Sequence, residues 1–262
     1  MVFKTIMTVI PTALFPFAQR YNIWCMKAIP GGRGGSKEQG SLGPRVAERI
    51  KDDIFRARLL PREPLIEAEL AAAHGVSKTP VREALSSLAR AGLVDLDPFR
   101  GARVRDFTAD DVREIYEMRV LLEPFALEKA VPRMDENDRG LLSSLLDDAD
   151  AAAERQDLYS LSGLNRAFHD ALVARCGNGR IIQTMGQIQD QLRAIALRSW
   201  MLTPTYPREA EQHRRVAEAV ASGDADRAAD LLRDHIVGFK EQFVGAFGHG
   251  PSEEEAEQIR RR

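Results

Sequence analysis

Cysteine is nearly absent from this sequence: Cys25 and Cys176 are the only two among 262 residues. Two isolated thiols make neither a disulfide framework nor a cysteine metal site. Aromatic residues reach only 6%, and no unbroken run of about 18 apolar residues is present to cross a membrane. These absences argue against a small secreted scaffold and against a membrane span, and they favour a protein of the cytoplasm.

The first forty residues differ from the rest. Residues 6–26 are apolar and aromatic but contain Pro11 and Pro16, and a glycine-rich stretch follows. Lys4 with this apolar stretch partly matches a secretory signal, but the prolines and the missing small-residue cleavage pattern argue against one. We interpret residues 1–40 as a disordered or mis-started leader and linker. We expect the charged residues 249–262 to form a frayed tail.

What is present favours helices. Hydrophobic residues make up 44% and charged residues 29% of the chain, and a chain of this length fits two domains. Residues 41–105 carry 12 Lys and Arg against 9 Asp and Glu, whereas residues 106–262 carry 20 against 29. Only the first part is therefore suited to approach a polyanion such as DNA.

Apolar residues at helical spacing predict three short helices, followed by a β-hairpin, in residues 41–106. The stripes are Val46, Ile50 and Ile54; then Ile66, Leu70 and Ala73; then Val81, Leu85 and Leu88. Gly75 fits the tight turn between the second and third helices, and Ala71 allows them to pack closely. The strands are expected at 93–96 and 102–105. This order is that of a winged helix-turn-helix.

The third helix presents donors to solvent at its start. Lys78, Arg82 and Ser86 share one face, and Ser77 and Thr79 lie beside it. In a helix-turn-helix the first residues of this helix reach base edges, and an arginine can donate two hydrogen bonds to guanine. Arg100 and Gly101 at the hairpin tip would contact the adjacent groove. The alternative is an ordinary N-cap followed by a solvated face.

Residues 107–248 predict an all-α antiparallel bundle. Thr108 with Asp111 forms a capping-box pattern that opens a helix containing Val112, Ile115, Leu122 and Phe125. Further helices are expected at 138–154, 158–174, 179–199, 208–221 and 226–247. Their short connections imply antiparallel neighbours.

Histidines in this bundle suggest a metal site. Asn165 and His169 share a helix face, and His213 and His235 lie on later helices. Three imidazoles and an amide oxygen suit a divalent transition metal. Each histidine taken singly is more often an ordinary core or surface residue.

The motif SKTPVREAL, with AGLV and FRGARV after it, resembles the GntR family of bacterial transcription regulators over residues 44–105. The chain departs from the family pattern at Arg62, where the family has glycine, and at Lys78, where it has arginine. Lysine keeps the charge but loses the bidentate geometry. The resemblance implies a DNA-binding regulator.

Residues 108–247 resemble the FCD subgroup of that family. This resemblance implies that Asn165, His169, His213 and His235 bind a metal, with zinc favoured and nickel or manganese as alternatives. It also implies that Arg119 points to a pocket for a small organic acid. An ordinary Arg119–Glu123 pair on a solvated face is the competing interpretation.

We therefore expect a homodimeric repressor of a near-palindromic operator, responsive to an organic acid, and not an enzyme. Activation is the alternative sign of regulation. A metalloenzyme is the competing class, although the chain has neither HExxH nor GxSxG. An interaction module with a vestigial metal site is a third reading.

Overall fold

A computed structural model describes residues 42–247 of the chain. The expected leader and linker (1–40), Cys25 and the charged tail (249–262) lie outside these residues. Within the described part, no helix is long and apolar enough to cross a membrane.

The first part of the described chain folds as predicted, into three helices and a hairpin. The elements are α2 (Leu42–Phe55), α3 (Glu67–His74), α4 (Lys78–Arg90), β1 (Val94–Asp97) and β2 (Gly101–Val104). The strands are antiparallel, with Val94 opposite Val104 and Asp97 opposite Gly101. Each strand lies one residue from its predicted position, because the turn rather than the apolar pattern sets the register.

Helices α2 and α4 pack closely through their apolar stripes. Ile50, Val81, Leu85 and Leu88 are all buried, and removing such side chains from water stabilises the fold by about 1.5–3 kcal/mol each. The stripe predicted for α3 is partly wrong. Ile66, at the N-cap position, is 47% exposed, and Ala73 also faces solvent, while Leu70 and Ala71 are buried.

Gly75 ends α3 in the left-handed region, with φ 65°. Its N–H donates to the carbonyl of Ala72, and the N–H of Val76 donates to that of Ala71. These bonds satisfy carbonyls at the end of the helix, and glycine adopts this conformation without a Cβ penalty. The turn therefore sets the direction in which α4 begins.

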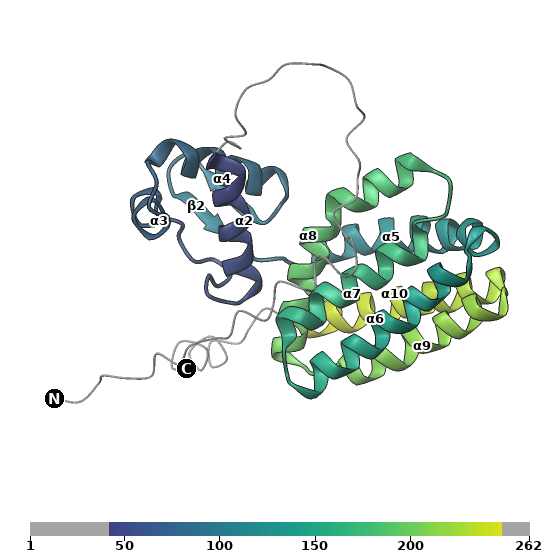
Figure 1. The fold of residues 1–262 in the computed structure, drawn as a ribbon. Helices are drawn as coiled ribbons and strands as arrows, with labels where there is room; N and C mark the ends of the chain where they lie inside the picture. The colour runs from purple at the N-terminus through teal and green to yellow at the C-terminus, as the bar shows by residue number, and fades with distance from the viewer. Residues whose placement is uncertain (1–41, 248–262) are drawn as a thin grey trace, which may run out of the picture. The chain divides into compact units, whose positions relative to one another are not determined.

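The rest of the described chain is helical (Figure 1). It comprises α5 (Ala109–Ala130), the 3₁₀ turn η1 (Val131–Arg133), α6 (Glu136–Glu154), α7 (Leu158–Val173), α8 (Gly179–Leu202), α9 (Tyr206–Ser222) and α10 (Ala225–Phe247). The capping box of Thr108 and Asp111 is confirmed. Helix α10 packs against α5 and α9, and α7 packs against α6 and α8.

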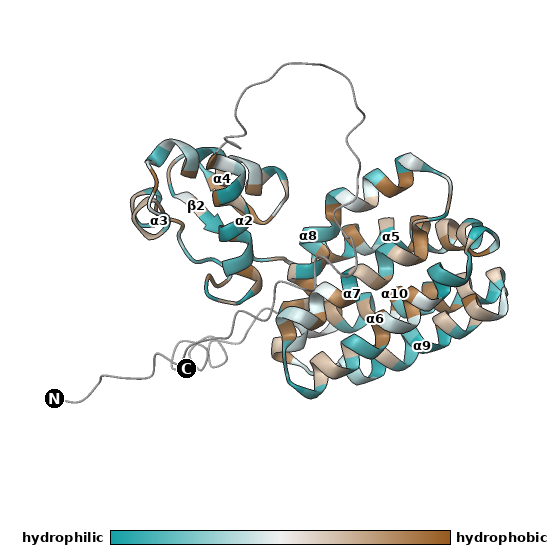
Figure 2. Cartoon of the chain, in the orientation of Figure 1, coloured by the Kyte–Doolittle hydropathy of each residue, from teal (hydrophilic) through white to brown (hydrophobic). Residues whose placement is uncertain are grey.

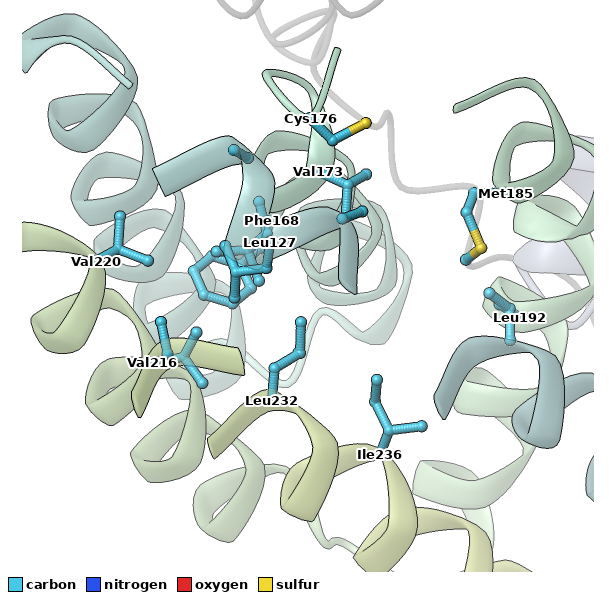
Figure 3. Packing of buried hydrophobic residues seen from close by; sticks show 14 of the residues in the cluster. Leu127, Phe168, Val173, Cys176, Met185, Leu192, Val216, Val220, Leu232 and Ile236 are labelled. Carbon is cyan, nitrogen blue, oxygen red and sulfur yellow. The ribbon is translucent and has the colours of Figure 1, made fainter. Parts of the chain in front are cut away.

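The helices of the bundle carry both apolar and polar residues (Figure 2). Their buried apolar side chains form one continuous cluster, in which Leu127, Phe168, Val216 and Leu232 meet from four helices (Figure 3). Phe125, which belongs to the stripe predicted for α5, is instead 48% exposed. Ala126 and Leu127 take the buried positions beside it.

Helix α5 continues through a proline, Pro124. Proline has no N–H, so it cannot donate to the carbonyl of Val120 four residues earlier. Nη1 of Arg233 on α10 donates to that carbonyl instead, over 3.3 Å. The neighbouring helix thus compensates for the bond that the proline removes.

Candidate functional site

The first turn of α4 carries donors and no acidic residue. Ser77 is the N-cap, but its side chain makes no capping hydrogen bond. Lys78 and Thr79 are exposed, whereas Pro80 and Val81 are buried. A helix N-terminus with unused hydroxyls and one cation suits a phosphate oxygen. Ser77 thus occupies the N-cap position expected of it, but without a side-chain capping bond.

Arg82 is exposed and oriented by a carboxylate. Its Nε donates to both oxygens of Glu67 on α3, at 2.9 and 2.8 Å. Because both bonds use Nε, the two terminal nitrogens remain available, and an arginine can donate from these to a base edge. Ser86, one turn further along, is half-buried.

The hairpin tip is a hydrogen-bonded turn. Oδ1 of Asp97 accepts hydrogen bonds from the N–H groups of Phe99 and Arg100, at 2.7 and 2.8 Å, and Gly101 has φ 75°. Phe99 is 98% exposed. A cleft of about 500 Å³ is lined by Arg82 and Ser86 of α4 and by Arg100 and Gly101 of the hairpin. Four of the predicted DNA-contacting residues thus share one concave surface, whereas Ser77, Lys78 and Thr79 are not among its lining residues.

The three histidines of the bundle come together in its interior. His169, His213 and His235 are all buried, and a nitrogen of each lies within 4.8 Å of the others. Nε2 of His213 is 3.1 Å from Nε2 of His235. Burial lowers the pKa of all three imidazoles. Lowered pKa values keep the rings neutral, which is the form that binds a metal.

Two of these rings are oriented through their other nitrogen. Nδ1 of His169 lies 3.0 Å from Oε2 of Glu123, and Nδ1 of His235 lies 3.0 Å from Oε1 of Gln212. A carboxylate or carbonyl acceptor at Nδ1 fixes the proton there and leaves Nε2 for a metal. Neither Glu123 nor Gln212 was predicted in this role.

Asn165 fits the same site. Its Oδ1 is buried and has no hydrogen-bond partner. A buried polar atom without a partner is costly, and an amide oxygen is a metal ligand. This orphaned oxygen, together with three neutral imidazole nitrogens, is a donor set that suits a divalent transition metal.

Arg119 and Glu123 form the expected i,i+4 pair, but inside the protein rather than on a solvated face. Their exposures are 5% and 2%. Nε of Arg119 donates to Oε1 of Glu123 at 2.5 Å, and Nη2 donates to Oε2 at 3.2 Å. Burial alone would raise the pKa of Glu123, but the charge of Arg119 and the hydrogen bonds from His169 and Arg119 lower it to about 2. The carboxylate is therefore ionised at neutral pH.

A cavity of about 20 Å³ lies beside these groups. Arg119, Asn165, His169 and His235 line it, as do the polar residues Ser162, Arg166, Gln189, Arg193 and Glu209. This volume admits a group the size of a water molecule, so a larger ligand requires side chains to move. The sequence does not single out Arg166, Arg193 and Glu209, because no motif distinguishes them from surface charges on amphipathic helices.

This fold and these surfaces define a class: a winged helix-turn-helix protein with a helical unit that holds a polar interior site. Comparison with family descriptions assigns residues 42–104 to the bacterial regulatory proteins of the gntR family and residues 114–238 to the FCD domain. The chain belongs to the GntR family and carries an FCD domain. It is a DNA-binding transcription regulator.

Individual relatives of the chain are also transcription regulators by name. The chain is 30% identical to the transcriptional repressor GlaR of Escherichia coli, over 72% of this chain and 89% of that one. It is 28% identical to a probable D-xylose utilization operon repressor of Paenarthrobacter nicotinovorans, over 74% and 87%. A solved GntR structure from Rhodococcus sp. RHA1 has TM-score 0.71 and 26% identity, over 78% of this chain and 98% of that one.

Proposed function

We propose that this regulator is a homodimeric repressor that holds a divalent metal in its FCD domain and releases its operator when a small organic acid binds there. The observation that carries the proposal is the buried cluster of three histidines beside a cavity lined with arginines. The names of relatives as repressors support the sign of regulation. All of these names describe regulators or repressors, so the metalloenzyme alternative gains no support from them.

In the DNA-binding role, Arg82 reads a base edge and Ser86 lies beside it. Ser77, Lys78 and Thr79 hold phosphates, and Arg100 and Gly101 of the hairpin contact the adjacent groove. The exposed donors of α4 and the cleft shared with the hairpin support this assignment.

The test is selection of genomic fragments by the full chain, followed by anisotropy titration of the enriched sequence. Arg82→Ala should lower specific affinity by about 10- to 100-fold, as expected for losing one bidentate base contact. Arg90→Ala, at the other end of the same helix, is the matched control. Equal affinities for the two variants would remove Arg82 from the interface.

In the metal-binding role, Asn165, His169, His213 and His235 are the ligands. A divalent metal bound there supplies an electrophile for a carboxylate oxygen. Zinc suits this donor set best, with nickel and manganese as alternatives. Elemental analysis of the purified chain should find about one metal per subunit. The same analysis of a variant with all three histidines changed to alanine should find no metal.

In the effector-binding role, Arg119 contributes a guanidinium beside the metal ligands, since its Nη2 is 3.2 Å from Nδ1 of His169. A carboxylate fits between a cation and a metal. Titrating organic acids into the operator complex should release the DNA, and Arg119→Gln should abolish release. Release without any acid dependence would contradict the proposal.

A homodimer follows from the expected near-palindromic operator, since two-fold symmetry presents two recognition helices to successive turns of DNA. One subunit has a mass of 29.2 kDa. Light scattering of the pure protein should give twice this mass. Such a regulator acts where its operator is, in the cytoplasm.

A further inference from the structure

Three arginines line the interior cavity, and two of them already have carboxylate partners. Arg119 is paired with Glu123. Nη1 of Arg166 is 2.9 Å from Asp190, and its Nε is 3.6 Å from Asp170. The charges of these two arginines are therefore largely balanced by the protein itself.

Arg193 of α8 differs from both. Its Nε donates to Oγ of Ser162 and its Nη2 donates to the carbonyl of Tyr159, each over 3.0 Å. Its guanidinium also lies 4.6 Å from the centre of the Tyr159 ring and 4.3 Å from the centre of the Phe55 ring. Unlike Arg119 and Arg166, it forms no ion pair with a carboxylate among residues 42–247, although the charge of Asp190 attracts it. Both hydrogen-bond partners are neutral, so no carboxylate is paired directly with this charge.

Such an arrangement favours an anion as a further partner. A guanidinium withdrawn from water loses hydration energy that neutral acceptors restore only in part. In keeping with this, burial lowers the pKa of Arg193. Arginine has five N–H donors, and two are used here, which leaves three for a ligand.

We propose that Arg193 binds a second carboxylate of the effector, so that the effector is a dicarboxylate. The inference rests on the proposed function, which places the first carboxylate beside the metal ligands and Arg119. Both ends belong to one site, because His169, His235 and Arg193 line the same cavity. Since this cavity is only about 20 Å³, Arg193 must shift as the ligand enters.

A dicarboxylate differs from a monocarboxylate of equal length only at the second end. The test is calorimetric titration of the zinc-loaded full chain with two matched pairs, succinate against butyrate and glutarate against pentanoate. At least one dicarboxylate should bind the unaltered chain about tenfold or more tightly than its partner, since a charge-assisted bond is added.

Arg193→Gln should lower the affinity for that dicarboxylate to the level of its monocarboxylate and leave the monocarboxylate unchanged. Arg193→Lys keeps the charge without the planar fork and should retain part of the preference. Arg180→Gln, on the exposed side of the same helix, is the matched control and should change neither affinity. Arg119→Gln should weaken both members of each pair.

The outcomes separate this inference from the function on which it rests. If the unaltered chain binds both members of each pair equally, the second subsite is overturned and the effector site stands. If Arg193→Gln and Arg193→Lys both weaken the two classes equally, Arg193 only supports the fold, and the inference is wrong. If none of these acids binds, this inference and the proposed organic-acid site both fail.

Discussion

Oε2 of Glu123 lies 3.0 Å from Nδ1 of His169, and the same carboxylate holds the buried guanidinium of Arg119. One ionised side chain thus joins a proposed metal ligand to the proposed effector cation. A change at either group alters the electrostatic environment of the other.

Glu123→Gln should lower metal affinity by about 10- to 100-fold, because the amide orients His169 without the negative charge that raises its basicity. Competition titration with a chromophoric chelator measures this. Glu117→Gln, exposed on the same helix, is the control. Unchanged metal affinity in the Glu123 variant would show that the carboxylate does not act through His169.

Glu67→Ala should reduce the specificity of DNA binding more than its strength. Glu67 orients Arg82 through Nε, and a mobile arginine still attracts phosphates but loses its fixed approach to a base. The ratio of specific to non-specific affinity, measured at one salt concentration, should fall several-fold. A fall in both affinities by the same factor would point to damage of the helix-turn-helix instead.

Two glycine-to-alanine substitutions should have opposite effects on stability. Gly75 has φ 65°, so alanine there should cost about 1–2 kcal/mol of unfolding free energy. Gly140 lies in α6 with open space around it, so alanine should add about 0.5–1 kcal/mol. Urea denaturation of both variants measures the two changes in unfolding free energy. Stabilisation by both substitutions would mean that the backbone at Gly75 is not under this constraint.

Glu209 should make stability depend on pH. Burial raises its pKa in the folded protein, although Thr205 and Trp200 donate hydrogen bonds that oppose the rise. A raised pKa means that the fold holds the proton more tightly than the unfolded chain, so this stabilisation is complete below about pH 4.5 and is lost as pH increases through the folded value.

Relative to Glu209→Gln, the unaltered protein should therefore become less stable between pH 4.5 and 7. Urea denaturation at the two pH values measures the difference, with Glu218→Gln on the same helix as the control for removing a charge. A difference that stays constant or grows with pH would contradict the raised pKa.

The sequence predicts the elements of this fold well, because helical periodicity, Gly75 and the capping box at Thr108 are local signals. It also identifies the histidines, since imidazole is rare enough for three to be noticed together. It does not identify Glu123 as a partner of His169, nor the position of Arg193 in the cavity without an ion-pair partner among residues 42–247. Those relationships join residues that are distant in the chain, and an arginine or glutamate on an amphipathic helix looks the same whether it faces water or a cavity.

Burial of the Arg119–Glu123 pair likewise cannot be predicted from the sequence. Its i,i+4 spacing is visible in the sequence, and it is equally compatible with a solvated face. Only the packing of α5 against α7, α8 and α10 decides that these charges lie inside, where each needs the other.

The proline in α5 has one more consequence. Because Pro124 leaves the carbonyl of Val120 free, Arg233 can donate to it. This bond joins α5, next to Arg119, to α10, two residues before His235. Sliding of α5 along α10 would break this bond as well as the packing contacts between the two helices, so we expect them to move together when a ligand enters. Motion that reaches the DNA would then arise in the other helices of the bundle.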